Sequence, residues 1–330
     1  MTAQSSLVVV TACYNDWPSL QTLLPLLDAA LVGRFRSAAV VVVDDGSSIS
    51  PPADLLSGHH YQVISKVEIL TLARNLGNQR AQALGIGWAA THAPADWLAV
   101  MDCDHEDRPE VIPELLKAAE ENSGKIVFAA RIGRTDGVIF RIFYALYSWL
   151  YRLLTGMPIA IGNFSIVPGA LIRRLAHVWE IGLHYPAGVM KARLPYTTIG
   201  AVRGRRVQGR SSMNFVNLFV HGFSGLAVHA EVAAMRVVLA TLVLSGVMLV
   251  YLGEVLFEKL FTDIPLLGWT SQIAVVLIVF LFQAFMSGLL LLFLVLSGRT
   301  QKQMIPYRDH GDLILEVLRL YPFADRKAAQ

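Results

Sequence analysis

Cysteine is scarce in this chain of 330 residues, which contains only Cys13 and Cys103. Two thiols cannot form a disulfide framework, and they are too few for a zinc site of four thiolates. The simplest interpretation is that the part of the chain holding these thiols lies in a reducing compartment.

Charge is also sparse. Charged residues make up 16% of the chain, against about 25% in an average soluble protein. Hydrophobic residues make up 54%, and the mean hydropathy is +0.50. These values exclude a disordered or collagen-like chain and indicate a globular part joined to membrane-embedded segments. The net charge of +3 is too small to indicate a nucleic-acid binder, so we expect no nucleic-acid partner.

Two common nucleotide-binding motifs are missing. No G-x-G-x-x-G follows the first predicted strand, and G-x-x-x-x-G-K-[ST] occurs nowhere in the sequence. The dinucleotide-binding and P-loop classes therefore lose the motifs that would support them.

The hydrophobic excess is concentrated in two uncharged runs, Val237–Gly253 and Ile273–Leu296. About 20 apolar residues cross a bilayer core, so the second run is long enough. The first reaches that length if it starts near Val232 and Arg236 extends to the interface. The alternative is two buried core helices, but uncharged runs of this length are rare in soluble cores. We predict two membrane spans within residues 232–298.

Basic residues flank both runs, whereas the loop at 254–272 carries three acidic residues and one lysine. This asymmetry predicts that both ends of the chain are cytoplasmic and that the loop is outside. The expected location is a bacterial inner membrane. The basic residues are Arg203, Arg205, Arg206, Arg210 and Arg236 before the first run, and Arg299, Lys302 and Arg308 after the second.

The remainder alternates between apolar runs and helical patterns. This alternation predicts an α/β fold with a mostly parallel sheet, in which ligands bind beyond the carboxyl ends of the strands. The expected helices cover about 17–32, 77–92 and 109–121. The expected strands are Leu7–Ala12, Ala38–Val43, Val67–Leu72, Trp97–Met101 and Ile126–Ala130.

Three expected strands end in polar clusters: Tyr14-Asn15-Asp16, Asp44-Asp45 and Asp102-Cys103-Asp104. With Glu106 and Asp107, the third cluster is a group of carboxylates that repel one another unless one is protonated or a cation lies between them. Their oxygens suit Mg²⁺ or Mn²⁺, with substrate phosphates completing the coordination shell.

Alternatives remain open for part of these clusters. Asp107 and Glu110 fit an acidic helix start, stabilised by the helix dipole. Asp44 and Asp45 suit either a turn or hydrogen bonds to a base or ribose.

Two more helices are expected. Gly137–Leu154 combines dense aromatic residues with Arg141 and Arg152, which is typical of a helix lying in the membrane interface. An ordinary core helix is the alternative. Leu313–Leu320 has the pattern of a short amphipathic helix that docks on the domain or mediates oligomer contact.

Five short motifs occur in a set order and are followed by the two apolar runs. In this order they resemble glycosyltransferase family two, from about Ser6 to Arg210. The closest resemblance is to the polyprenyl-phosphate glycosyltransferases, the group that includes dolichol-phosphate mannose synthase. The motifs are Tyr14-Asn15-Asp16, Val43–Ser47 (VDDGS), Arg74–Gly77 (RNLG), Asp102–Glu110 (DCDHEDRPE) and Arg206-x-x-Gly209-x-Ser211.

The resemblance implies a glycosyltransferase A-type, Rossmann-like sheet with interface helices and two transmembrane helices. It implies a UDP- or GDP-sugar donor, a Mg²⁺ or Mn²⁺ cofactor, and undecaprenyl or dolichyl phosphate as acceptor. Nucleotide-binding residues would be Tyr14, Asn15, Asp16, Asp44, Asp45, Arg74 and Asn75. Metal ligands would be Asp102, Asp104 and Glu106. Catalytic residues would be Asp102, Asp104, Arg131 and Arg206, with Arg131, Arg206 and Ser211 contacting the acceptor phosphate.

The resemblance also divides the chain into functional segments. A catalytic core is expected at 1–135, an acceptor-side segment at 136–231, and a cytoplasmic tail at 299–330, with self-association plausible through the interface helices. One departure concerns catalysis, because Asn163 stands where the family often has an acidic residue in a GDF-like string.

The expected reaction is inverting transfer of one sugar to the lipid phosphate. An acceptor phosphate is already an anion near neutral pH, so no strong general base is required. Positioning and charge neutralisation would be the work of the enzyme. Alternatives are an inactive membrane-anchored scaffold that binds nucleotide sugars, and a polysaccharide synthase. The second is disfavoured by the two spans and by the lack of a Q-x-x-R-W string.

Overall fold

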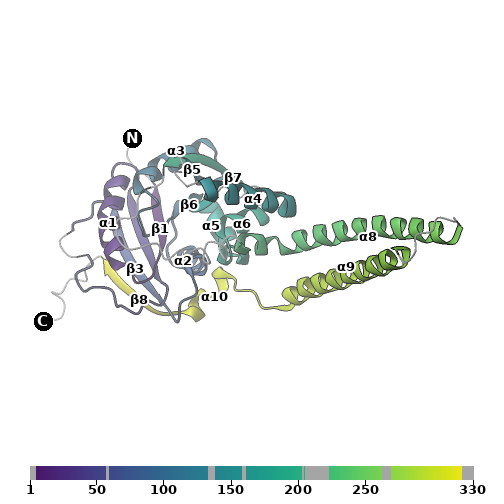
Figure 1. Cartoon of the computed structure of the whole chain (residues 1–330). Helices are drawn as coiled ribbons and strands as arrows, with labels where there is room; N and C mark the ends of the chain where they lie inside the picture. The colour runs from purple at the N-terminus through teal and green to yellow at the C-terminus, as the bar shows by residue number, and fades with distance from the viewer. Residues whose placement is uncertain are drawn as a thin grey trace. The chain divides into compact units, whose positions relative to one another are not determined.

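The computed structural model describes residues 5–56, 59–132, 138–157, 161–202, 204, 223–261 and 269–321 (Figure 1). The chain forms two compact units. The first comprises residues 1–141, 159–228 and 303–330, and the second comprises 142–158 and 229–302.

The first unit is built on an eight-stranded sheet with the order β7-β5-β6-β4-β1-β2-β3-β8 (Figure 1). Every pairing among β1–β4 and between β5 and β7 is parallel, whereas β6 and β8 run against their neighbours. The predicted α/β fold with a mostly parallel sheet is therefore confirmed. The strands are β1 (Ser6–Cys13), β2 (Ser37–Asp44), β3 (Ile64–Leu72), β4 (Trp97–Val100), β5 (Ile126–Ile132), β6 (Ile161–Pro168), β7 (Tyr196–Val202) and β8 (Ile314–Tyr321).

Helices cover both faces of this sheet because its central strands are apolar on both sides. Along β1, Val9 packs in one core cluster with α1 and α3, whereas Val8 and Val10 pack in a second with α2, α5 and α6. The three helices expected from the sequence are confirmed. The helices of this unit are α1 (Trp17–Leu31), α2 (Asn78–His92), η1 (Pro109–Val111), α3 (Ile112–Glu121), α5 (Gly169–Ala176), η2 (Trp179–Gly182), α6 (Tyr185–Lys191) and α10 (Pro306–Leu313).

The helix expected at Leu313–Leu320 is wrong, because most of this segment forms β8. Its backbone pairs antiparallel with the edge of β3. Leu318 and Leu320 pack against one core cluster, whereas Ile314 and Val317 pack against the other. Tertiary pairing has overridden a pattern that also suits a helix, since an available sheet edge satisfies the backbone hydrogen bonds of the segment.

A buried carboxylate on β3 ties β8 to the sheet. Glu68 Oε1 lies 2.8 Å from Lys66 Nζ and 3.1 Å from Arg319 Nε, and Trp88 Nε1 donates to Glu68 Oε2 at 3.4 Å. Burial by itself raises the pKa of Glu68, but the ion pairs and hydrogen bonds from these partners outweigh burial and lower it. The ionised form of Glu68 is therefore favoured in the folded protein.

We expect Glu68→Gln to lower the free energy of unfolding by about 1 kcal/mol, since Lys66 and Arg319 keep contact with water. The pKa of Glu68 is lower in the folded than in the unfolded protein, so its contribution is present above its ordinary value of 4.5 and is lost as pH falls below it. Thermal unfolding of wild type and variant between pH 3.5 and 7 would measure this difference. Equal unfolding midpoints at pH 7 would contradict it.

The second unit contains α8 (Ala230–Phe261), α9 (Trp269–Thr300) and most of α4 (Val138–Thr155). By length and composition, Ala230–Phe261 and Gln272–Gly298 are candidate membrane spans, and only 6% of the most apolar window of each is buried. Their apolar side chains are therefore exposed, unlike those of core helices. Helices α8 and α9 pack against each other.

One face of α4 presents exposed apolar side chains at helical spacing: Leu146, Trp149, Leu150 and Leu153. Arg236 of α8 caps the carboxyl end of this helix, with its Nη1 donating to the carbonyl of Leu153 at 2.6 Å. A cation is favourable there because the helix dipole leaves the last carbonyls partly negative. The guanidinium therefore links α8 to α4.

Candidate functional site

The loops that follow β1 and β2 are locked together at the carboxyl edge of the sheet. The backbone N–H of Asn15 donates to Ser47 Oγ at 2.9 Å. Asn15 Oδ1 accepts from the N–H groups of Ser48 at 3.0 Å and Ile49 at 3.1 Å. Asn15 adopts φ = +53°, a conformation that asparagine tolerates better than most residues. The first two motifs therefore form one surface.

The carboxylate of Asp45 connects this surface to the R-N-L-G motif. Its two oxygens accept from the N–H groups of Leu76 at 2.7 Å and Gly77 at 2.9 Å. Burial raises the pKa of Asp45; these two hydrogen bonds lower it, and the neighbouring Asp44 raises it, so that the net pKa is raised. Asp45 is thus a buried carboxylate that shapes the loop.

Gly46 allows the two motifs to approach this closely. Its φ is +70°, and a Cβ there would lie 2.7 Å from the backbone nitrogen of Asn75. Only glycine combines this conformation with this contact. On the other side of the turn, Asp44 Oδ1 accepts from the N–H of Ser47 at 2.9 Å.

The predicted nucleotide-binding residues all belong to these three loops. Tyr14, Arg74 and Asn75 are exposed, Asn15 and Asp16 are half-buried, and Asp44 and Asp45 are buried. The sheet thus gathers the predicted group at one edge. Its role in nucleotide binding stays a prediction.

The acidic loop follows β4 at the same edge. Asp102 Oδ1 accepts from Gln82 Nε2 at 2.7 Å and from Asn78 Nδ2 at 3.0 Å. The N–H of Asp102 donates to Asp107 Oδ2 at 2.9 Å, and the N–H of Glu106 donates to Asp104 Oδ1 at 3.0 Å. The carboxylates of Asp104 and Asp107 therefore also hold the loop backbone in shape. No sequence pattern points to Asn78 or Gln82, since both lie in a helix without a recognisable motif.

His105 anchors this loop to α1, a role that no sequence pattern predicts. It is buried, has φ = +66°, and its Nε2 lies 2.9 Å from the carbonyl of Ser19 and 2.8 Å from Thr22 Oγ1. A carbonyl can only accept, so Nε2 carries the hydrogen. The histidine therefore has a structural role.

The segment that leads towards Arg206 in the sequence begins beside the acidic loop. The N–H of Gly204 donates to the carbonyl of Glu106 at 2.9 Å, and a Cβ on Gly204 would collide with the carbonyl oxygen of His105. Arg206 and Ser211 lie outside the described residues. The backbone of Arg131 belongs to β5, but its side chain also lies outside the described part.

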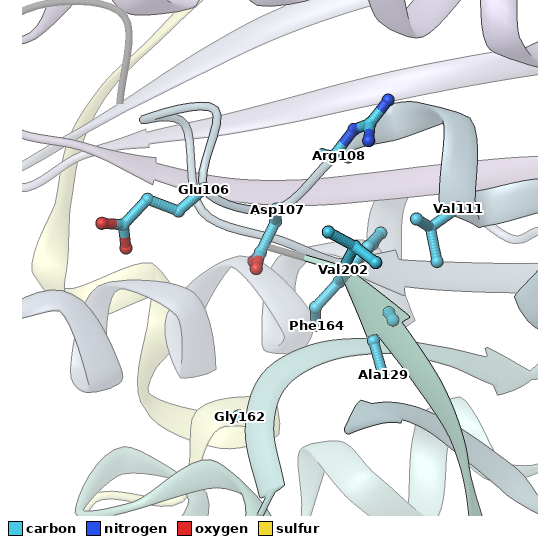
Figure 2. Close-up of a pocket in the computed structure, with 9 residues that line it drawn as sticks. Glu106, Asp107, Arg108, Val111, Ala129, Gly162, Phe164 and Val202 are labelled. Atoms are coloured by element: carbon cyan, nitrogen blue, oxygen red, sulfur yellow. The ribbon is translucent and has the colours of Figure 1, made fainter. Parts of the chain in front are cut away.

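The donor set suits a hard divalent cation, although the predicted three ligands are not gathered. Asp102 and Asp104 are half-buried carboxylates at the end of β4, and Mg²⁺ is commonly held by one or two carboxylates together with substrate phosphates. Within the described residues, no three His, Cys, Asp or Glu side chains form a metal-binding group. Figure 2 shows Glu106 and Asp107 leaving the same loop in different directions.

A pocket opens beside this loop (Figure 2). Its polar side comes from the acidic loop, and its apolar side comes from β5, β6 and β7. Gly162, the neighbour of Asn163, contributes to the wall. The lining residues are Glu106, Asp107, Arg108, Val111, Ala129, Gly162, Phe164, Ala201 and Val202. A small polar group with an apolar extension would match these two sides.

Both cysteines are buried and unbridged beneath the site. A hydrogen bond with the Cys13 thiol, burial, and the charges of Asp16 and Asp102 hold the pKa of Cys103 well above its ordinary range. Thiolate chemistry is thereby disfavoured at Cys103.

Sequence comparisons relate the chain to known proteins. Residues 8–182 match the description "Glycosyl transferase family 2". An uncharacterized glycosyltransferase of Bacillus subtilis, YkcC, is 25% identical over 295 residues, which are 88% of this chain and 86% of that protein. An undecaprenyl-phosphate 4-deoxy-4-formamido-L-arabinose transferase of Klebsiella pneumoniae is 29% identical over 167 residues. That match covers 51% of this chain and 49% of the transferase, so this chain spans about half the length of such relatives.

Among solved structures, a mannosyltransferase from Pyrobaculum calidifontis, determined with GDP-Man and Mn²⁺, resembles the chain with a TM-score of 0.44 and 16% identity. The match covers 87% of this chain and 88% of the mannosyltransferase.

The family match and the named relatives define the chain as a glycosyltransferase. It belongs to glycosyl transferase family 2, since the matched region covers more than half of its length. The predicted resemblance to this family is confirmed, and polyprenyl-phosphate sugar transferases are among its relatives.

Proposed function

We propose that the protein transfers a single sugar from a UDP- or GDP-sugar to a polyprenyl phosphate, with inversion. The observation that carries the proposal is the meeting of four loops at one edge of the sheet. The loops after β1, β2 and β3 form a hydrogen-bonded surface, and the acidic loop lies beside them with Asp102 held by two amides. This is the edge at which open α/β sheets bind ligands.

Binding of the donor would use both parts of this edge. Tyr14, Arg74 and Asn75 are exposed for contact with the nucleoside. Asp102 and Asp104 would hold Mg²⁺ or Mn²⁺, and the metal, when bound, neutralises the charge that develops on the departing diphosphate. Half-burial of the two carboxylates strengthens such electrostatic effects, because less water screens them.

Binding of the acceptor would use the pocket together with the arginines that the family resemblance assigns to the acceptor phosphate. An anionic phosphate oxygen can attack the anomeric carbon directly, so the protein has to position it and to balance its charge. We assign phosphate contacts to Arg131, Arg206 and Ser211. Two observations support this assignment: Gly204 contacts the acidic loop, and the pocket residues Ala129 and Ala201 lie on the paired strands β5 and β7.

The lipid part of the acceptor would remain in a bilayer crossed by α8 and α9. The chain leaves the first unit at residue 228 and returns to it at residue 303, after which β8 pairs with β3 of the sheet. An even number of spans accounts for this return, which supports placing both ends on one face. The basic flanks favour the cytoplasmic face. The exposed apolar face of α4 suits a helix that lies on the membrane surface.

The relatives support the acceptor class. The transferase of Klebsiella pneumoniae is named for undecaprenyl phosphate, and the match to it includes about half of each chain. A sugar–lipid phosphate of this kind would serve synthesis of a cell-envelope glycan. We propose the bacterial inner membrane as the site of action and leave self-association to be tested by the mass of the purified particle.

The test is an assay of the full-length protein in detergent with undecaprenyl phosphate, a panel of UDP- and GDP-sugars, and Mg²⁺, Mn²⁺ or chelator. We expect one donor class to give a lipid-linked monosaccharide that disappears with chelator. Tight donor binding without turnover would instead indicate a scaffold protein. Polymeric products would indicate a polysaccharide synthase, and either result would overturn the proposal.

A further inference from the structure

One polar side chain is buried on the apolar face that α2 turns towards the sheet. Gln82 has no exposed surface, and the adjacent Ala81, Ala83 and Leu84 are buried as well. A buried amide is destabilising unless its donors and its acceptor are hydrogen-bonded. The partners of Gln82 therefore indicate what the side chain does.

Gln82 links Asn163 on β6 to Asp102 behind β4. Its Nε2 donates to Asp102 Oδ1 at 2.7 Å, and its Oε1 accepts from Asn163 Nδ2 at 2.9 Å. The hydrogen-bonding chemistry fixes the orientation of the side-chain amides of both Gln82 and Asn163, because an ionised carboxylate can only accept hydrogen bonds. Gln82 must turn its NH₂ group to Asp102, so its carbonyl needs a donor, and the amide of Asn163 is that donor.

A second side-chain amide, that of Asn78, donates to the same carboxylate oxygen of Asp102. Asn78 lies one helical turn before Gln82, so both side chains extend from one face of α2. Asn78 Nδ2 donates to Asp102 Oδ1 at 3.0 Å. Two donors from a rigid helix thus hold one carboxylate oxygen, and the position of that oxygen depends on the amide chain that ends at Asn163.

We propose that Gln82 and Asn163 are positioning residues, which hold the Asp102 carboxylate in the orientation needed for the metal and diphosphate of the donor. This inference rests on the proposed function. It gives a physical reason for asparagine at position 163. An aspartate there has no hydrogen to donate when ionised, so it would face the carbonyl of Gln82, and reversing that amide would turn the carbonyl against Asp102.

The direct test measures metal binding and not turnover. Binding of UDP and of GDP to the full-length protein would be titrated by calorimetry at increasing Mn²⁺. Gln82→Met keeps the length of the side chain and removes both hydrogen bonds. We expect it to raise the Mn²⁺ concentration for half-maximal nucleotide binding by about 10- to 100-fold, the usual effect of losing a residue that orients a metal ligand.

Gln79, three residues before Gln82 on α2, provides a matched control. Gln79 Oε1 accepts from the N–H of Tyr185 at 2.7 Å, so Gln79→Met removes a different hydrogen bond. We expect this variant to leave the Mn²⁺ requirement unchanged. Circular dichroism and unfolding midpoints of both variants would establish that the domain is folded.

A double-mutant cycle tests the link itself. Asn163→Asp should raise the Mn²⁺ requirement in the wild-type background by an amount similar to Gln82→Met. In a Gln82→Met background it should have little further effect, because no amide carbonyl remains to oppose the introduced carboxylate. Equal effects in the two backgrounds would overturn the link.

Two negative outcomes are distinguishable. If wild-type protein and Gln82→Met bind UDP or GDP equally well in a Mn²⁺-dependent way, the positioning role of Gln82 is contradicted. The proposed function is not affected by that result. If wild-type protein shows no Mn²⁺-dependent binding of either nucleotide, the proposed metal-dependent function falls and this inference falls with it.

Discussion

Asp104→Asn is expected to lower the rate of lipid-linked sugar formation by about 100- to 1,000-fold, the range found when one preorganised electrostatic contact to a transition state is removed. The amide keeps the size of the side chain, and its oxygen can still accept from the N–H of Glu106, which bonds Asp104 Oδ1 at 3.0 Å in the wild type. The loop should therefore keep its shape and lose only a negative charge. The measurement is initial rate against metal concentration at saturating donor.

Glu110→Gln is the matched control for that variant. Glu110 belongs to the same acidic segment, but it is exposed and its Oε2 lies 3.4 Å from Arg108 Nε. Exposed pairs of this kind contribute about 0–1 kcal/mol, so we expect the rate to stay within about twofold. A rate for Asp104→Asn equal to that of Glu110→Gln would show that Asp104 has no role in charge neutralisation.

Asp28→Ala is expected to have the largest effect on stability. This buried residue of α1 accepts three backbone hydrogen bonds: from the N–H groups of Gln62 at 2.8 Å, Val63 at 2.9 Å and Ile64 at 2.8 Å. Each donor left unsatisfied costs about 1–3 kcal/mol, so the loss from the three donors together should be about 3–9 kcal/mol. For a domain of this size the unfolding midpoint should fall by about 10 °C or more.

The measurement is thermal unfolding followed by circular dichroism, with Asp54→Ala as the comparison because Asp54 is exposed. The three amides lead into β3, the strand between β2 and β8, so the variant should also weaken protection of β8 against hydrogen exchange. An unfolding midpoint within 2 °C of wild type would contradict this account of Asp28.

The sequence was sufficient for the first half of the sheet. Runs such as Leu7–Ala12 and Ala38–Val43 are apolar on both faces, and their pattern survives because both faces are covered by helices. Strand β6 (Ile161–Pro168) was missed because it mixes glycine, asparagine and serine with its apolar residues. Strand β8 was mistaken for a helix because its pattern suits either element, and the deciding factor, the open edge of β3, is remote in sequence.

Within the site, too, local sequence pattern predicts some residues, whereas contacts between distant segments determine others. The placement of Asp44, Asp45, Asp102 and Asp104 at one edge of the sheet could be predicted, because each lies at the end of a buried strand or in the loop that follows it. Gln82 could not, because its role depends on Asn163, 81 residues further along the chain. Contacts of this kind leave no periodic trace in a single sequence. The positions of Arg206 and Ser211 remain predictions.

Strand β8 also has a consequence for how the protein is made. Synthesis proceeds from the N-terminus, so the ribosome completes β1–β7 and both long apolar helices before residues 314–321 emerge. Until then the outer edge of β3 has no partner from β8, and an unpaired edge strand promotes association with other chains. The nascent protein therefore keeps an unpaired strand edge, which promotes aggregation, until its membrane segments and β8 have been synthesised.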